Sequence, residues 1–197
     1  MSDLLIFSCN ADELLIASGK RVGIEVQSYS PIWKGYVDGK LRHGIEFLEP
    51  RTEEFAMFLD GADTLLLKSE AEILARLTVP VLIAAERTCW PDAELGDRFP
   101  YADHPRFPNA GGYIGKRTEL IAAMKTVLQW ATGEDDQRAW TAALLAGVLP
   151  NVRIDHERRI FCSQGDWDTE KADPCSRHYN GRVPGRQEFW EALNAGI

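Results

Sequence analysis

The chain has 197 residues, with 22 Lys and Arg against 30 Asp and Glu, and a formal net charge of -8. Hydrophobic residues make up 45% and charged residues 26% of the chain, the composition of an ordinary globular protein. The acidic excess argues against a nucleic-acid partner, because binding the phosphate backbone requires a basic face. A chain of this length can bury one sizeable core, so we expect a single domain over residues 1–197.

The N-terminus and the cysteines bear on location. Only four large apolar residues follow Asp3, whereas a secretory signal has a basic start and about 7–15 apolar residues. No apolar run approaches the roughly 18 residues of a membrane span. The four cysteines show neither a CxxC motif nor a zinc-binding spacing, so we expect reduced thiols. These features predict a cytoplasmic protein without a membrane span; no heptad pattern indicates its oligomeric state.

Short apolar runs alternate with amphipathic segments, which is the pattern of an α/β sheet covered by helices. We expect strands at residues 4–9, 22–26, 55–59, 79–84, 112–114, 152–154 and 159–161. A helix is expected at residues 69–77, because Ser69 and Glu72 form a capping box. Apolar residues at helical spacing predict further helices at 118–130 and 136–149, and residues 187–195 form a candidate terminal helix.

Residues 86–111 lie between these elements, with four prolines and no convincing periodicity. Structureless segments of this length inside a domain are usually functional or disordered. The aromatic side chains Trp90, Phe99, Tyr101 and Phe107 favour an ordered, packed loop at a binding site. Residues 166–185 are also irregular.

Two carboxylates, Asp60 and Asp63, follow the predicted strand at 55–59. Ligands of open α/β sheets collect outside the carboxyl ends of strands, and carboxylates there suit Mg²⁺ or Mn²⁺, which in turn would hold a diphosphate. A simple Asp-Gly turn after the strand explains the same residues.

Three further segments have both a chemical and a structural interpretation. Paired glycines at 111 and 112 would let the backbone approach a ligand closely. Asp135 and Asp136 open a predicted helix, where the helix dipole alone is enough to explain acidic residues. His178 lies in a polar tail and is either a ligand or a solvated or packed side chain.

Taken in order, the segments MFLDGAD, AERTCWP, NAGGYIG and DDQ, beginning at residues 57, 85, 109 and 135, resemble the glycosyltransferase domain of the procollagen lysyl hydroxylase/glycosyltransferase family. The resemblance is closest over residues 55–165 and looser before residue 50. It implies a GT-A-type, Rossmann-like α/β fold: a mixed, mostly parallel sheet flanked by helices, in a single domain. Residues 166–197 would supply the C-terminal part of the metal and donor site.

The resemblance also implies roles for individual residues. Asp60, Asp63 and His178 correspond to metal ligands, and this ligand set suits Mn²⁺, with Mg²⁺ as the alternative. Trp90 corresponds to an aromatic side chain that closes over the sugar nucleotide. Asp135 and Asp136 correspond to the acidic pair beside the donor sugar and the acceptor, and either is a candidate general base. The residues expected to bind the nucleotide sugar are Ser8, Asn10, Lys40, Asp60, Asp63, Asn109, Gly111, Gly112, Asn180 and Gly181.

The activity implied is metal-dependent transfer of a hexose, galactose or glucose, from a UDP-sugar to a hydroxyl on a glycan, a peptide or a small molecule. Two positions depart from the family. Tyr179 replaces the first glycine of a His-Gly-Asn-Gly segment, and Ala62 stands where the family can offer a tyrosine to the base. Two other hypotheses therefore stay open: a nucleotide-sugar-binding module without activity, and a metal-dependent UDP-sugar hydrolase.

Overall fold

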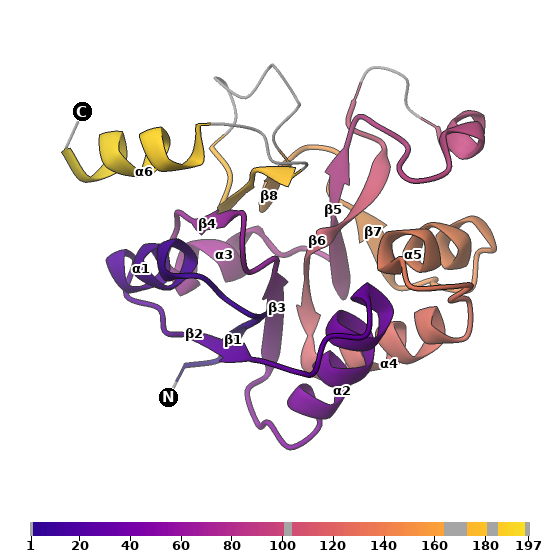
Figure 1. The fold of residues 1–197 in the computed structure, drawn as a ribbon, viewed down its shortest axis with the longest axis horizontal. Coiled ribbons are helices and arrows are strands. Elements are labelled where there is room, and N and C mark those ends of the chain that lie inside the picture. Colours follow the sequence, from indigo (N-terminus) through magenta and orange to yellow (C-terminus); the bar gives the residue numbers. More distant parts are fainter. Residues whose placement is uncertain (1, 101–103, 164–172, 181–184, 196–197) are drawn as a thin grey trace.

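The computed structural model describes residues 2–100, 104–163, 173–180 and 185–195. Its central sheet has six strands in the order β2-β1-β3-β6-β5-β7. β6 runs antiparallel to both of its neighbours, and the other pairings are parallel. The mixed, mostly parallel sheet predicted from the sequence is thereby confirmed (Figure 1). Its strands are β1 (Leu4–Cys9), β2 (Val26–Tyr29), β3 (Phe55–Leu59), β5 (Val81–Glu86), β6 (Phe107–Lys116) and β7 (Val152–Ile154).

A second, three-stranded sheet brings the C-terminal part of the chain to the end of β3. It consists of β4 (Thr64–Leu66), β9 (Ser176–His178) and β8 (Phe161–Ser163), in the order β4-β9-β8. β4 pairs antiparallel with β9, so that Thr64 lies opposite His178. This pairing fixes a residue near the C-terminus beside the turn that follows β3.

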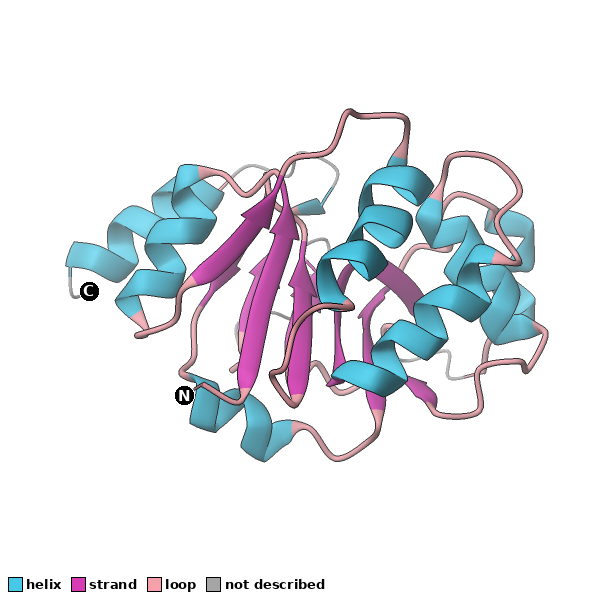
Figure 2. Ribbon diagram, turned by 90° about the horizontal axis from the view of Figure 1, so that it is seen from below, coloured by secondary structure: helices cyan, strands magenta, loops and turns pink. Residues whose placement is uncertain are grey.

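Helices cover both faces of the central sheet (Figure 2). One face is covered by α1 (Glu13–Arg21), α3 (Glu70–Arg76) and the small sheet. The other is covered by the π-helix η1 (Val37–Arg42), which runs directly into α2 (His43–Leu48), and by α4 (Arg117–Leu128) and α5 (Asp136–Leu145). A short 3-10 helix, η2 (Ala93–Arg98), and the terminal α6 (Arg186–Ala195) complete the described elements. No described helix has the length and apolar character needed to cross a membrane.

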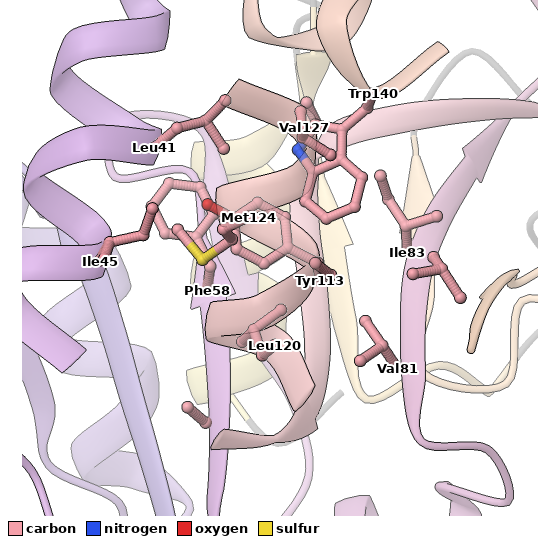
Figure 3. Close-up of a cluster of buried hydrophobic side chains, with 14 of the residues drawn as sticks. Leu41, Ile45, Phe58, Val81, Ile83, Tyr113, Leu120, Met124, Val127 and Trp140 are labelled. Carbon is pink, nitrogen blue, oxygen red and sulfur yellow. The ribbon is translucent and has the colours of Figure 1, made fainter. Parts of the chain in front are cut away.

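The core follows from the two-residue period of the strands, which turns alternate side chains to opposite faces. In β3, Phe58 packs toward α2 and α4, whereas Met57 packs toward α1 and α3. The first of these clusters is built around three aromatic rings (Figure 3). Tyr113 stacks on Phe58 with ring centroids 4.7 Å apart, and its other neighbour is Trp140 at 5.4 Å. Both faces of the central sheet are therefore covered by apolar side chains, as expected of a layered α/β domain.

Several predicted boundaries were wrong. The strand predicted at 22–26 begins only at Val26, because Val22 caps α1 and Gly23 adopts a φ of +78°. The helix predicted at 136–149 ends at Leu145. The predicted loop at 86–111 is shorter than expected, since its first residue belongs to β5 and its last five belong to β6. The strand predicted at 159–161 overlaps β8 only at Phe161, and β9 lies within residues 166–185, which were expected to be irregular. The helices α1, η1, α2 and η2 and the strand β4 were not predicted.

Candidate functional site

A cavity of about 660 Å³ opens at the carboxyl ends of β3 and β5. Such an edge is where α/β sheets bind ligands. Ten of the residues predicted from the sequence line it: Lys40, Asp60, Asp63, Trp90, Asn109, Gly111, Asp135, Asp136, His178 and Asn180. The other lining residues are Tyr36, Glu86, Thr88, Ala110 and Gln137. Segments separated by more than a hundred residues of chain thus meet at one polar cavity.

The predicted metal ligands Asp60, Asp63 and His178 lie together, with ligand atoms all within 4.8 Å of one another. His178 Nε2 is 3.1 Å from Asp63 Oδ1 and 3.5 Å from Asp60 Oδ2. Two carboxylates and an imidazole converging at this spacing form a donor set that suits Mn²⁺. Only the short β3–β4 turn and the β4–β9 pairing are needed to bring the three together.

The orientation of the imidazole is fixed by Asn109. Its Oδ1 accepts the backbone N–H of Gly111 at 3.0 Å, so this atom is the amide oxygen. The same Oδ1 lies 3.0 Å from His178 Nδ1, which must therefore donate a proton to it. In the neutral ring the lone pair is then on the buried Nε2, which faces the carboxylate oxygens of Asp63 and Asp60 and has no donor to accept from among the described residues. An orphaned lone pair facing two carboxylates fits a bound divalent cation.

Electrostatics around the imidazole agree with this arrangement. Burial by itself would lower the pKa of His178, but the contact with Asp63 and the charge of Asp60 outweigh it, so the pKa is raised. Burial would raise the pKa of Asp63, but the contact with His178 lowers it overall. The pocket thus attracts positive charge strongly, whether as a proton or as a metal ion.

The glycine at 111 is required for the imidazole to fit. A Cβ at this position would lie 2.1 Å from His178 Cε1 and 2.4 Å from its Nδ1. We expect Gly111→Ala to displace the ring and to weaken Mn²⁺ binding by about tenfold or more, as for other residues that orient a ligand. Titration of Mn²⁺ measures this. The matched control is Gly96→Ala, since a Cβ at Gly96 meets nothing closer than 3.7 Å. Equal Mn²⁺ affinity in the two variants would contradict the role of Gly111.

Lys40 is a buried cation between two acids. Its Nζ lies 2.6 Å from Asp60 Oδ1 and 3.7 Å from Asp136 Oδ2, and the residue is only 7% exposed. Burial would lower the pKa of Lys40, but the charges of Asp136 and Asp60 raise it well above its ordinary value. The ammonium therefore stays charged at the cavity wall, where an anionic group of a ligand could reach it.

The adjacent acids Asp135 and Asp136 differ in environment. Asp135 is the N-cap of α5 and accepts the N–H of Arg138 at 2.8 Å. Asp136 is buried, and its Oδ2 has no hydrogen-bond partner among the described residues. Burial raises the pKa of Asp136 to about 6; Lys40 opposes the shift, and Asp60 and Asp135 add to it. Asp135 has a structural role as the helix cap, whereas Asp136 caps nothing. Its burial in the cavity wall and its raised pKa mark Asp136 as the stronger candidate base.

Two functional candidates, Glu86 and Gln137, were missed by the sequence analysis. The buried Glu86 carboxylate accepts from Gln137 Nε2 through one oxygen and from Asn180 Nδ2 through the other, the latter at 2.9 Å. Gln137 Nε2 also donates to the carbonyl of Trp90 at 2.9 Å. The available signal was a glutamate at the end of an apolar strand. These hydrogen bonds connect the loop that contains Trp90 with α5 and with Asn180, which follows β9. Together these parts form one wall of the cavity.

Three of the predicted residues, all of them described in the structure, do not line the cavity. Ser8 is buried in β1, opposite Ser28 of β2. Asn10 lies behind the β3–β4 turn, because its carbonyl would be 2.5 Å from a Cβ at Gly61. Gly112 faces the ring of Phe161 instead. Gly181 lies outside the described residues. The positions of Ser8, Asn10 and Gly112 therefore do not support direct contact with a ligand in this cavity.

Tyr179, which stands next to His178 where the family has a glycine, does not narrow the site. Its side chain is 1% exposed and is not among the residues lining the cavity. Its backbone N–H donates to the carbonyl of Asp63 at 2.8 Å. The tyrosine therefore packs inside the protein and helps to hold the β3–β4 turn.

Two solved structures of glycosyltransferases have similar folds. A glycosyltransferase involved in glycosylation of the major capsid of PBCV-1 matches with a TM-score of 0.61 at 14% identity, over 98% of both chains. The galactosyltransferase LgtC, in complex with donor and acceptor sugar analogues, matches with a TM-score of 0.57 at 12% identity, over 98% of this chain and 95% of the other. At these identities the likeness establishes the fold, which is of the GT-A type.

Sequence comparison points to one family. The human multifunctional procollagen lysine hydroxylase and glycosyltransferase LH3 is 32% identical over 130 residues, covering 61% of this chain and 17% of that protein. Human procollagen-lysine,2-oxoglutarate 5-dioxygenase 2 is 24% identical over 166 residues, covering 80% and 22%. The chain thus spans less than a quarter of the length of these relatives. The family model described as the PLOD GT domain matches residues 37–171, more than half of the chain. The chain therefore belongs to the PLOD glycosyltransferase-domain family, and its fold is of the GT-A type.

Proposed function

We propose that this protein transfers a hexose, galactose or glucose, from a UDP-sugar to a hydroxyl acceptor in a reaction that depends on Mn²⁺. The observation that carries the proposal is the meeting of Asp60, Asp63 and the unpartnered Nε2 of His178 at the wall of the 660 Å³ cavity. Mg²⁺ is the alternative cation. The acceptor is a glycan, a peptide or a small molecule, and the acceptors of the much longer relatives are not assumed.

The first task of the site is to stabilise the leaving group. Breaking the bond between the sugar and the diphosphate leaves negative charge on the nucleotide. A divalent cation supplies Lewis-acid stabilisation of that charge when it is bound. Asp60, Asp63 and His178 would hold it, and the Lys40 ammonium, at 2.6 Å from Asp60, adds a fixed positive charge on the same side.

The second task is to take the proton from the acceptor hydroxyl. Asp136 is suited to it because burial raises its pKa to about 6, which makes it ionised at neutral pH and more basic than an ordinary aspartate. Asp135 keeps one oxygen occupied as the helix cap, which orients the start of α5 and so the position of Asp136. Glu86 and Gln137 fix the backbone of the Trp90 segment relative to the same helix.

Incubation with a panel of UDP-sugars and Mn²⁺, in the presence and absence of acceptor mixtures, tests the proposal. Released UDP and free hexose are followed separately. Transfer gives acceptor-dependent UDP without an equal amount of free hexose. Free hexose in the absence of acceptor would instead indicate a hydrolase, and Mn²⁺-dependent UDP binding with no loss of donor would indicate a binding module. Absence of any UDP or UDP-sugar binding would contradict the proposal altogether.

Trp90 is expected to keep water away from the reacting sugar. It lines the cavity, yet 61% of its surface is exposed, so its truncation should not disturb the core. We expect Trp90→Ala to lower turnover by about tenfold and to raise the share of donor lost as free hexose, since water gains access to the site. Separate assays of UDP and hexose measure this share. The matched control is Trp130→Ala, which truncates a tryptophan that is 38% exposed and does not line the cavity. An unchanged partition in Trp90→Ala would contradict the role.

A further inference from the structure

A single arginine joins the C-terminal helix to the turn that carries the metal ligands. Arg186 is the first residue of α6, and 12% of its side chain is exposed. Its Nη1 donates to Asp12 Oδ2 at 2.5 Å and to the carbonyl of Ala62 at 2.7 Å. Its Nη2 donates to Asp12 Oδ1 at 2.8 Å and to the carbonyl of Thr64 at 2.7 Å. The guanidinium thus pairs with a carboxylate in two places and holds two carbonyls on either side of Asp63.

These contacts add to the hydrogen bonds that hold the metal loop, by which we mean residues 60–63. The N–H of Asp60 donates to Gly111, and the carbonyl of Gly61 accepts the N–H of Asp12, each at 2.9 Å. The carbonyl of Asp63 accepts from Tyr179 at 2.8 Å. The carbonyl of Ala62 is held by Arg186. Backbone groups away from regular pairing need such partners to take up one conformation, and Arg186 supplies the partner of the Ala62 carbonyl.

The terminal helix has little else to hold it. None of the side chains of α6 is buried. Besides Arg186, its contacts with the rest of the protein include the Arg177 guanidinium 4.5 Å from the Phe189 ring and a hydrogen bond from Arg21 to the Leu193 carbonyl at 3.3 Å. Figure 1 shows α6 on the same side of the molecule as α1 and β4, and β4 follows the metal loop directly in the chain. Burial of an apolar face therefore does not explain why the helix docks here.

We propose that Arg186 is a positioning residue that fixes the metal loop, so that Asp63 stands at the distance from His178 that a divalent cation requires. The inference rests on the proposed function, because it assumes that Asp60, Asp63 and His178 bind the cation. Arg186 reaches the site only through the carbonyls of the loop and through Asp12, which is also the N-cap of α1 and accepts the N–H of Leu15. Without the guanidinium, the loop keeps its ligands but no longer holds them in one arrangement.

Mn²⁺ affinity of the purified full chain tests this, measured by calorimetry or by electron paramagnetic resonance of free Mn²⁺ at a temperature where every variant is folded. We expect Arg186→Gln to weaken Mn²⁺ binding by about tenfold. Arg186→Lys should recover part of the loss, because an ammonium can still donate to one of the carbonyls. The matched control is Arg21→Gln, which removes a different contact to α6 but none to the metal loop; its Mn²⁺ affinity should stay within about twofold of the parent.

The outcomes separate this inference from the proposed function. If the parent chain binds no Mn²⁺, the proposed metal site is wrong and the inference falls with it. If the parent binds Mn²⁺ and Arg186→Gln binds it equally well, only the inference is wrong. An equal loss in Arg21→Gln would show that docking of α6 as a whole matters, and would overturn the specific role. Should Arg186→Gln fail to fold, Asp12→Asn replaces it: the asparagine can still cap α1 but loses its charge, and unchanged Mn²⁺ affinity in this variant would also overturn the role.

Discussion

Replacement of Asp63 by alanine is expected to weaken Mn²⁺ binding by about 100-fold and to leave the protein folded. Its carboxylate faces His178 Nε2 at 3.1 Å and is one third exposed, so its removal takes away a ligand without opening the core. Removal of a direct ligand should cost at least as much as the 10- to 100-fold typical of residues that only orient ligands. Mn²⁺ titration and thermal unfolding of the same samples measure the two effects.

Replacement of Asp60 serves as the contrasting variant. Asp60→Ala should lose Mn²⁺ binding as well, but it also removes the closest partner of the buried Lys40 ammonium. Breaking a buried ion pair typically costs about 3 kcal/mol or more, and Asp136 at 3.7 Å compensates only in part. We therefore expect a clear fall in melting temperature for Asp60→Ala and little change for Asp63→Ala. Retention of Mn²⁺ binding in Asp63→Ala would remove that residue from the metal site.

Replacement of Asp136 by asparagine is expected to abolish transfer while donor binding persists. Loss of a general base typically lowers the rate by about 10²–10⁴-fold. Affinities for UDP and Mn²⁺ should stay within about twofold, because Asp136 is not among the predicted metal ligands and Lys40 keeps Asp60 as its partner. Equilibrium binding and turnover, measured on the same preparation, distinguish a loss of transfer from a loss of donor binding. Full turnover in Asp136→Asn would exclude it as the base and leave Asp135 as the candidate.

The pH dependence follows from the same carboxylate. A base must be ionised to accept a proton, so activity of the parent should fall as the pH drops through about 6, the pKa of Asp136. In the folded chain this pKa lies above its value of 3.8 in the unfolded chain. The folded state therefore holds the proton more tightly, and ionisation of Asp136 costs stability as the pH rises from about 4 to about 6. Asp136→Asn avoids that cost and should be no less stable than the parent at pH 7.

The parts of the fold that the sequence predicted are those with a local signal. The helix α3 begins where the capping box of Ser69 and Glu72 places it, and the apolar runs of β1 and β3 match the strands residue for residue. The helix α1, which contains a glycine, was not predicted. Gly19 is explained only by the sheet, since a Cβ there would lie 2.7 Å from Val26 Cγ2. The π-turn η1 also depends on tertiary contacts, because it buries the charged Lys40 against acids from two other elements.

The site likewise contains residues with a local signal in the sequence and residues that depend on tertiary contacts. Two signals were enough to predict the three candidate ligands from the sequence. These were the carboxylates at the end of a strand and a family resemblance that pairs them with His178. The partners of Glu86 were not accessible in this way, because Gln137 and Asn180 are 51 and 94 residues away along the chain. Arg186 reaches Asp12 across 174 residues. Neither a period nor a motif encodes such pairings, so only the folded chain reveals them.

The order of the central sheet determines which stretch of the gene can be expressed as an independent unit. The family match begins at residue 37 and ends at residue 171. β1, however, lies inside the sheet between β2 and β3, and β9 closes the small sheet against β4. A fragment trimmed to the matched residues would leave the edge of β3 bare and would omit His178 altogether. Cloning boundaries for this protein and its homologues should therefore enclose β1 at one end and α6 at the other.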